Sequence, residues 1–173
     1  MNDFERDYWM GTEVGQLGGY GFQGAIFGVD GSCKDGKMGS GCCKFQGEEA
    51  DKCARVGREE EGTSSNRPEL GGVVLALQSA DLIEDVLHAL LLCGNAAVLC
   101  AIKKWVGQGG KATLATAPDA DILREIVCRP TQRVRAGRFT FLLKAKSHRG
   151  EPINEQADIL AEEGREISDD NKR

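Results

Sequence analysis

Some segments of the chain are continuous apolar runs, and in others apolar residues recur at helical spacing. This pattern predicts a mixture of strands and helices. Residues 24–33 are a nearly continuous apolar run, which is typical of a strand in the middle of a sheet. Leu70, Val73 and Leu77 instead recur at helical spacing. In chain order we expect strands over 24–33, 38–47, 51–60, 86–93 and 138–146, and helices over 66–80, 96–106, 119–134 and 153–166.

Glycine and proline add local detail to this pattern. The segment 47–50 is interpreted as the connection between the second and third strands, and the third strand is polar enough to be an edge. Gly71 and Gly72 weaken the first helix by about 1 kcal/mol each, so we expect them to allow close packing against the sheet. Pro130 predicts a kink or an early stop in the third helix.

The order βββαβααβα predicts an α/β fold with a mixed five-stranded sheet and helices on both faces. Residues 24–166 form the predicted domain, and residues 167–173 form a polar tail. Residues 1–23 are rich in glycine and have no clear period. They are interpreted as a flexible leader or the remnant of a linker to an upstream domain; alternatively, Tyr8 and Trp9 dock on the domain as an extra cap.

Composition narrows the class of protein. The 173 residues are 40% hydrophobic, enough for one domain with a core. No apolar run approaches the roughly 20 residues of a membrane span, and the acidic, polar start is no signal peptide. The seven cysteines form no CxxC pair, so a zinc site is not expected, and their odd number favours an intracellular, reducing compartment. Cys93, Cys100 and Cys128 lie in apolar surroundings and are predicted to be small core residues.

The net charge of −5 is unevenly distributed. Residues 101–150 carry 11 Lys and Arg against 3 Asp and Glu, whereas residues 1–100 carry 8 against 16 and residues 151–173 carry 3 against 8. Most charge runs are solvated helix faces. A basic segment inside an acidic chain also suits a surface that contacts backbone phosphates, and we favour that interpretation.

Candidate chemistry is concentrated near the C-terminus. His148 lies in a loop between the last predicted strand and the last predicted helix, and Asp158 lies about one turn inside that helix. A mobile histidine near a fixed carboxylate suits a site that holds a metal ion and moves a proton. The alternative is that His148 is a solvated loop residue and Asp158 an ordinary helix acid.

Three motifs together resemble the type-1 ribonuclease H family, including domains fused to reverse transcriptases. The run Phe-Gly-Val-Asp-Gly-Ser-Cys at 27–33 looks like its opening strand with the first catalytic Asp. The run Ser-Asn-Arg-Pro-Glu-Leu at 65–70 resembles the start of its first helix, which carries the catalytic Glu. The segment 148–158 matches the family's His-x-Gly…Asn-Glu-x-x-Asp pattern in residue type and spacing.

The resemblance implies cleavage of the RNA strand of an RNA/DNA hybrid by an endonuclease that uses two Mg²⁺ or Mn²⁺ ions. Asp30, Glu69 and Asp158 would be the metal ligands, and His148 would assist proton movement or product release. Candidates for contacting sugar or phosphate are Ser32, Asn66, Arg67 and Asn154. Carboxylate oxygens are the ligands that such ions prefer. The resemblance also implies an upstream reverse transcriptase domain, as in a retrotransposon polypeptide. We expect a monomer without a membrane partner.

One carboxylate of the family's pattern is missing. The family has an Asp at the end of the fourth strand, and counting back from Trp105 puts Gly94 at that place. Asn95 follows and could offer a neutral amide oxygen only if the chain shifts by one residue. The family's additional basic helix is also replaced, by the nearly uncharged link 111–118. We therefore expect impaired cleavage and a weaker intrinsic grip on substrate.

Three other functions fit parts of the sequence. A non-catalytic hybrid-binding module would keep the basic surface without chemistry. A docking domain for a reverse transcriptase or another protein would need neither cleavage nor hybrid binding. This interpretation is favoured if the charges between Lys103 and Arg149 lie on unrelated faces. Cleavage of DNA by an integrase-like or resolvase-like relative is disfavoured by the Asn-Arg-Pro-Glu run at 66–69.

Overall fold

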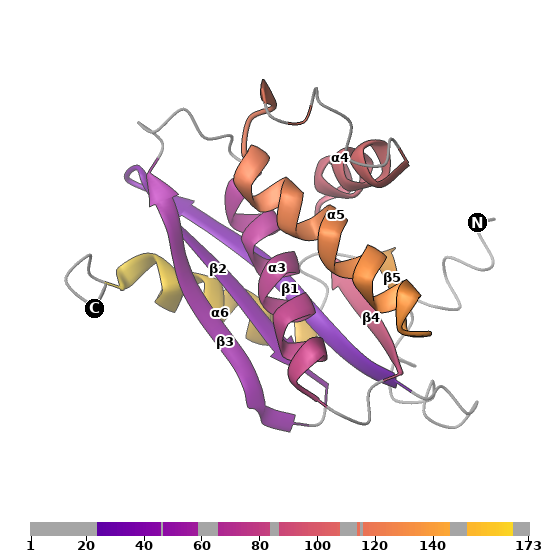
Figure 1. Ribbon diagram of the computed structural model, residues 1–173. Coiled ribbons are helices and arrows are strands. Elements are labelled where there is room, and N and C mark those ends of the chain that lie inside the picture. Colours follow the sequence, from indigo (N-terminus) through magenta and orange to yellow (C-terminus); the bar gives the residue numbers. More distant parts are fainter. Residues whose placement is uncertain are drawn as a thin grey trace.

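The computed structural model describes residues 24–45, 47–58, 66–83, 87–107, 114, 116–145 and 152–167 (Figure 1). Its elements follow the predicted order of strands and helices. The strands are β1 (Gly24–Lys34), β2 (Lys37–Lys44), β3 (Gly47–Arg58), β4 (His88–Cys93) and β5 (Phe139–Lys144). The helices are α3 (Arg67–Leu82), α4 (Ala96–Gly107), α5 (Ala120–Arg135) and α6 (Pro152–Glu166). None of the helices described is long and apolar enough to cross a membrane.

The five strands form one mixed sheet in the order β3-β2-β1-β4-β5, which confirms the predicted architecture. β1 pairs with β2, and β2 with β3, in antiparallel fashion, whereas β1–β4 and β4–β5 are parallel. Asp35 and Gly36, with φ of 52° and 73°, make the two-residue turn between β1 and β2. β3 is an edge of the sheet, as its polar sequence predicts.

Helices cover both faces of the sheet, and the alternation of side chains along β1 explains why two apolar cores form. α3, α4 and α5 lie on one face, and α6 lies on the other (Figure 1). Phe27 belongs to the core beneath α3, together with Val73 and Leu77. Its neighbour Ile26 belongs to the second core, beneath α6, together with Ile153.

Glycines let both helix layers approach the central strands closely. A Cβ at Gly71 of α3 would lie 2.2 Å from the Ser40 hydroxyl oxygen, so the predicted packing role of this glycine is confirmed. On the other face, a Cβ at Gly41 of β2 would lie 2.1 Å from the carbonyl oxygen of Ala157 in α6. A side chain at Gly41 would have to displace backbone atoms of α6, whereas one at Gly71 would have to displace the side chains of Ser40 and Val56.

Three expectations from the sequence are wrong. Residues 47–50 do not connect β2 to β3 but belong to β3, because an edge strand tolerates polar residues and Gly47 already pairs with Lys44. Cys100 and Cys128 are exposed rather than buried, since the helical period turns them outward from α4 and α5; Cys93 is buried as predicted.

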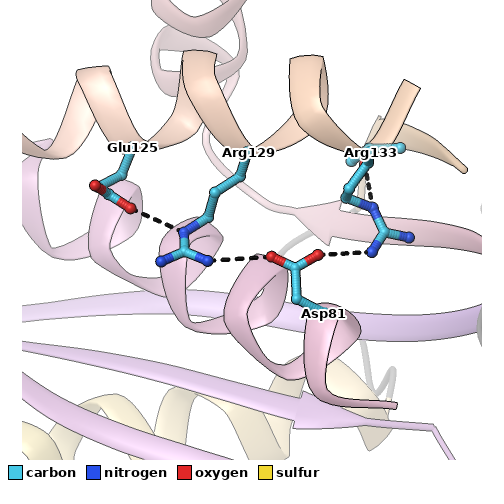
Figure 2. A network of polar contacts seen from close by, with 5 residues as sticks. Asp81, Glu125, Arg129 and Arg133 are labelled. Carbon is cyan, nitrogen blue, oxygen red and sulfur yellow. Dashed lines mark hydrogen bonds and ion pairs between the residues drawn. The ribbon is translucent and has the colours of Figure 1, made fainter. Parts of the chain in front are cut away.

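Pro130 does not stop α5, which continues to Arg135. Contacts on both sides of the proline fasten the helix to its neighbours (Figure 2). Arg129 and Arg133 donate hydrogen bonds of 3.1 and 2.9 Å to the two carboxylate oxygens of Asp81 in α3. Arg133 also donates to the Thr140 hydroxyl of β5, at 3.1 Å. These contacts stabilise the packing of a helix that its internal proline destabilises by roughly 3 kcal/mol.

Candidate active site

Two of the predicted acidic residues meet where α3 begins above β1. The carboxyl groups of Asp30 and Glu69 are joined by a hydrogen bond. Gly31 makes this approach possible, because a Cβ there would lie 2.4 Å from the backbone nitrogen of Glu69. The N–H of Gly31 also donates a 2.8 Å hydrogen bond to Asp30 Oδ1, which fixes that carboxylate.

Burial and mutual repulsion keep this pair from carrying two full charges. Burial, the charge of Asp30 and the hydrogen bond between the two carboxyl groups, in this order of size, raise the pKa of the Glu69 carboxyl to about 8. Hydrogen bonds from Asn95 and Cys93 act in the opposite direction. At neutral pH and without a cation, Glu69 therefore holds its proton.

The end of β4 supplies a thiol to this site instead of a carboxylate. Cys93 is fully buried, and its Sγ lies 3.9 Å from Glu69 Oε2. Burial, followed by the charge of Glu69, raises the pKa of the Cys93 thiol to about 12, so the sulfur stays neutral. The sequence predicts only a core role for Cys93; its contact with Glu69 follows from its place as the last residue of a strand beside β1.

Asn95, next to Gly94, is committed to the start of α4. Its Oδ1 accepts hydrogen bonds from the N–H groups of Ala97 and Val98, at 2.9 and 3.2 Å. Its Nδ2 donates to Asn66 Oδ1 at 3.4 Å. The amide oxygen that the sequence left open as a substitute ligand is thus occupied as a helix cap. Asn95 instead joins α4 to the start of α3.

α6 brings Asp158 to the same region from the opposite face of the sheet. Asp30 pairs with Gly41 across β1 and β2, and Gly41 packs directly against the carbonyl of Ala157. Asp158 is the next residue along α6 and is half-buried. In the ranges described, however, no three His, Cys, Asp or Glu side chains are close enough together to hold a metal ion. The structure brings Asp30 and Glu69 together, but within the part of the chain that it describes these two carboxylates form no cluster with Asp158.

The predicted substrate contacts fall into different surroundings. Ser32 accepts a 2.6 Å hydrogen bond from Arg165 of α6, and Asn66 accepts one from Asn95. Asn154 is only 4% exposed, and its Oδ1 has no hydrogen-bond partner among the described residues. His148 lies outside those residues.

Arg67 is held by internal contacts. Its Nε donates to the carbonyl of Val56 in β3, and its two terminal nitrogens bind the carboxylate of Asp121 at 2.9 and 2.7 Å. A further contact of 3.4 Å reaches Asp119. Arg67 thereby joins β3, α3 and the start of α5. Its predicted contact with substrate remains a prediction.

The basic segment is divided between structural and exposed charges. Arg129 and Arg133 form ion pairs with Asp81, and Arg133 is 3% exposed. Lys103 and Lys104 are exposed on α4, the helix that starts at Asn95, and Arg124 is exposed on α5. Among the described residues of this segment, Arg135 of α5 and Lys144 of β5 are exposed as well, so the exposed charges lie mainly, but not entirely, on the two helices that follow the candidate site in the chain.

The donor groups fit a divalent cation incompletely. Two adjacent carboxyl groups, one of which must hold a proton, form a place where a cation would relieve repulsion. Gly94 contributes no side-chain oxygen, and the amide oxygen of Asn95 accepts a hydrogen bond from the Ala97 N–H group of α4. The arrangement supports binding of an ion that prefers oxygen, with fewer ligands than a complete site has.

Comparisons with known proteins agree with the fold and with the family resemblance. A family model described as RNase H matches residues 23–166. Ribonuclease HI of Caulobacter vibrioides is 32% identical over 139 residues, which cover 79% of this chain and 89% of that protein. The crystal structure of RNase H1 from the halophilic archaeon Halobacterium salinarum NRC-1 aligns with a TM-score of 0.54. It covers 81% of this chain and 96% of its own at 17% identity, so this likeness concerns the RNase H-like fold.

Proposed function

The chain belongs to the RNase H family, and from that premise we propose that it binds RNA/DNA hybrids and hydrolyses the RNA strand at a strongly reduced rate. The observation that carries the proposal is the end of β4. There Cys93 supplies a neutral thiol, and Gly94 supplies no side chain. The amide oxygen of Asn95 is already used as the cap of α4. The remaining carboxylates match the family's motif.

Asp30, Glu69 and Asp158 would hold two Mg²⁺ or Mn²⁺ ions. When bound, such ions lower the pKa of the attacking water and stabilise the leaving oxygen. Asp30 and Glu69 are already adjacent, and a bound cation would offset the repulsion that helps to raise the pKa of Glu69. The half-buried Asp158 follows the residue that packs on Gly41, the strand partner of Asp30. This placement supports its role as the third carboxylate.

Other residues of the chain would orient the substrate and move protons. His148 would carry a proton away from the reacting phosphate. Asn66, Ser32, Arg67 and Asn154 are the proposed contacts to sugar and phosphate, and the 2′-hydroxyl would distinguish RNA from DNA. The exposed Lys103, Lys104 and Arg124 would contact backbone phosphates, so binding should weaken steeply with salt.

Loss of the fourth carboxylate impairs this chemistry in two ways. The metal ions would be held by fewer charged oxygens, so they would bind more weakly. The attacking water would also be less well oriented. A combined loss on the order of 3 kcal/mol of transition-state stabilisation corresponds to about 100-fold in rate.

A second candidate is a hybrid-binding domain without cleavage. The lack of a group of three metal ligands in the described part of the chain favours it. We further propose that a reverse transcriptase domain precedes this domain and that the protein is a monomer. These two points rest on the sequence alone. The seven cysteines are all free thiols, and a reducing, intracellular compartment is proposed on that basis.

The decisive experiment compares the unmodified chain with Gly94→Asp on a labelled RNA/DNA hybrid, in Mg²⁺ and in Mn²⁺. Gly94→Asn is the matched control, because it adds similar volume without charge. We expect Gly94→Asp to accelerate cleavage about 100-fold and Gly94→Asn to leave it unchanged.

The other outcomes separate the rival functions. Equal, rapid cleavage by the unmodified chain and Gly94→Asp would show that position 94 does not hold the missing ligand. Salt-dependent hybrid binding with no cleavage by either protein would identify a binding module. Neither cleavage nor binding would leave a docking domain.

A further inference from the structure

A group of cations lies where β1 turns into β2 and α6 ends. Lys34 and Lys37 are exposed strand partners on the two sides of the turn. Arg165, in the last turn of α6, contacts β1 at the same place, and its side chain is only 13% exposed. None of the three belongs to residues 101–150, where the sequence concentrates its basic charge. The fold, rather than spacing in the chain, brings these cations together.

Close packing of α6 on β2 places Arg165 beside the strands. A Cβ at Gly39 would lie 2.1 Å from the backbone nitrogen of Arg165, so the absence of a side chain at Gly39 permits this approach. Arg165 Nη1 donates a 2.6 Å hydrogen bond to the Ser32 hydroxyl oxygen of β1. A hydroxyl that accepts from a cation can still donate its own hydrogen, and it donates more strongly. Ser32 thus presents an O–H group supported by a positive charge.

One carboxylate, that of Glu166, lies among these cations. Its Oε1 accepts a 3.1 Å hydrogen bond from Arg165 Nε, and its Oε2 lies 3.8 Å from Lys37 Nζ. The hydrogen bond from Arg165 and the charges of Lys37 and Lys34 lower the pKa of the Glu166 carboxyl. The Glu166 side chain is 62% exposed. An internal anion therefore occupies a surface position that an anion from solution can also reach.

Stabilisation of the end of α6 does not account for the position of the Arg165 side chain. Cations near the last turn of a helix interact favourably with its carbonyl groups. Arg55 of β3 makes such a contact, through a 3.1 Å hydrogen bond from Nη1 to the Ile167 carbonyl oxygen. Arg165 instead turns to β1 and contacts the Ser32 hydroxyl. Its charge is therefore placed beside the strand surface.

Ser32 lies in the same row of β1 side chains as Asp30. The strand partners of these residues, Gly39 and Gly41, both face α6, so Asp30 and Ser32 face α6 too. Two residues along a strand span about 7 Å, and phosphates follow each other every 3.4 Å or so, about half that distance, along the axis of a duplex strand. A phosphate about two nucleotides from a phosphate at Asp30 is thus within reach of Ser32 and Arg165.

We propose that this end of the sheet is a phosphate subsite, made of Ser32, Lys34, Lys37 and Arg165, and that Glu166 occupies it in the free protein. The inference rests on the proposed function, because the phosphate belongs to the backbone of the RNA/DNA hybrid. On binding, the phosphate displaces the Glu166 carboxylate from Arg165 and accepts a hydrogen bond from the Ser32 hydroxyl. Glu166 therefore lowers the affinity for the hybrid by competing with it.

Fluorescence anisotropy of a labelled hybrid, with chelator present to prevent cleavage, tests the subsite. Glu166→Gln removes the competing anion and should tighten binding about threefold at low salt. Arg165→Gln should weaken binding about threefold and reduce the slope of log affinity against log salt by about 0.9, the value for one phosphate contact. In the Arg165→Gln background, Glu166→Gln should have a smaller effect, because the two side chains contact each other.

Glu155→Gln is the matched control, since it makes the same change of charge on the same helix. Glu155 is exposed and lies three turns before Glu166, about 16 Å along the axis. That distance exceeds the Debye length of about 10 Å at 0.1 M salt, so Glu155→Gln should leave the affinity unchanged. Equal tightening by Glu155→Gln and Glu166→Gln would overturn the subsite in favour of a general charge effect.

The remaining outcomes separate this inference from the proposed function. Hybrid binding that is intact and the same in Glu166→Gln as in the unmodified chain would overturn the inference and leave the proposed function standing. This variant decides even where Arg165→Gln fails to fold, because its position is largely exposed. No binding of the hybrid by the unmodified chain at any salt concentration would overturn both.

Discussion

The Sγ atom of Cys93 lies 3.9 Å from Oε2 of Glu69, so β4 ends in a neutral sulfur beside the carboxyl pair. We propose that the family's further Asp would stand at the next position, Gly94. Under this proposal the Asp30–Glu69 pair keeps its mutual repulsion but lacks one further carboxylate. The protonation of this carboxyl pair and its response to added cations therefore measure whether the pair can still bind a metal ion.

The stability of the metal-free protein should fall as pH rises. An unfolded glutamate releases its proton near pH 4.5, whereas folded Glu69 keeps its proton to about pH 8. Between these values the folded state binds more protons, so the free energy of unfolding decreases with increasing pH. Urea unfolding in chelator should show a decrease on the order of a few kcal/mol across this window. Glu69→Gln should flatten the profile, and the exposed Glu155→Gln should not.

Added Mg²⁺ should reverse that loss at pH 8 to 9, because a cation that binds only the folded state stabilises it. A pH profile that stays unchanged in Glu69→Gln would contradict the assigned pKa. A protein whose unfolding midpoint at pH 9 ignores millimolar Mg²⁺ would show that the carboxyl pair alone does not retain an ion.

Asn95 should prove to be a helix cap and not a metal ligand. Asn95→Ala removes the acceptor for the Ala97 and Val98 N–H groups, and it should destabilise the protein by about 1 kcal/mol. Asn95→Asp keeps that acceptor but loses the amide donor to Asn66 and Glu69, so it should lose less thermal stability than Asn95→Ala when Mg²⁺ is present. If cleavage assays show that Asn95→Asp accelerates the reaction as strongly as Gly94→Asp does, the ligand position has shifted by one residue and the cap assignment is incomplete.

Much of the fold could be predicted because it depends on local periodicity. The apolar run that became β1 and the helical spacing of Leu70, Val73 and Leu77 specify the elements and their order. Of the two outcomes predicted at Pro130, the early stop is wrong and the kink stays a prediction; ion pairs of Arg129 and Arg133 with Asp81, 48 and 52 residues away in sequence, tie the helix on both sides of the proline. Tertiary contacts of this kind leave no local pattern.

The candidate site was predictable in part for the same reason. Motif spacing identified Asp30 and Glu69, which do meet. It could not identify the contact of Cys93 with Glu69, since that depends on β4 lying next to β1. It also could not show that the Asn95 oxygen is used by α4, because the same residue type suits a cap and a ligand.

Gly41→Ala should displace α6 and with it Asp158. The added methyl would lie 2.1 Å from the Ala157 carbonyl oxygen, which is backbone and cannot rotate away. We expect a destabilisation of about 3 kcal/mol, within the range of overpacked cores, and loss of any cleavage that Gly94→Asp confers. Gly36→Ala is the control: its φ of +73° is strained for alanine, but no atom lies within 4 Å of the new Cβ. It should cost only about 1 kcal/mol and preserve cleavage. Equal effects of both substitutions on thermal unfolding and on activity would argue against close packing of α6 on β2.

The network around Arg133 should be the most sensitive polar contact outside the site (Figure 2). Arg133 is 3% exposed, and its Nη2 has no hydrogen-bond partner among the described residues, so its charge depends on Asp81. Asp81→Asn leaves that cation buried without a counter-ion and should lower the free energy of unfolding by about 3 kcal/mol. Glu125→Gln also removes a partner of Arg129, but that carboxylate is 50% exposed, and the expected loss is below about 1 kcal/mol. Urea unfolding of the two variants side by side measures the difference. A loss of less than about 1 kcal/mol in Asp81→Asn would mean that water reaches Arg133, and that apolar packing, rather than this network, holds α5 together across Pro130.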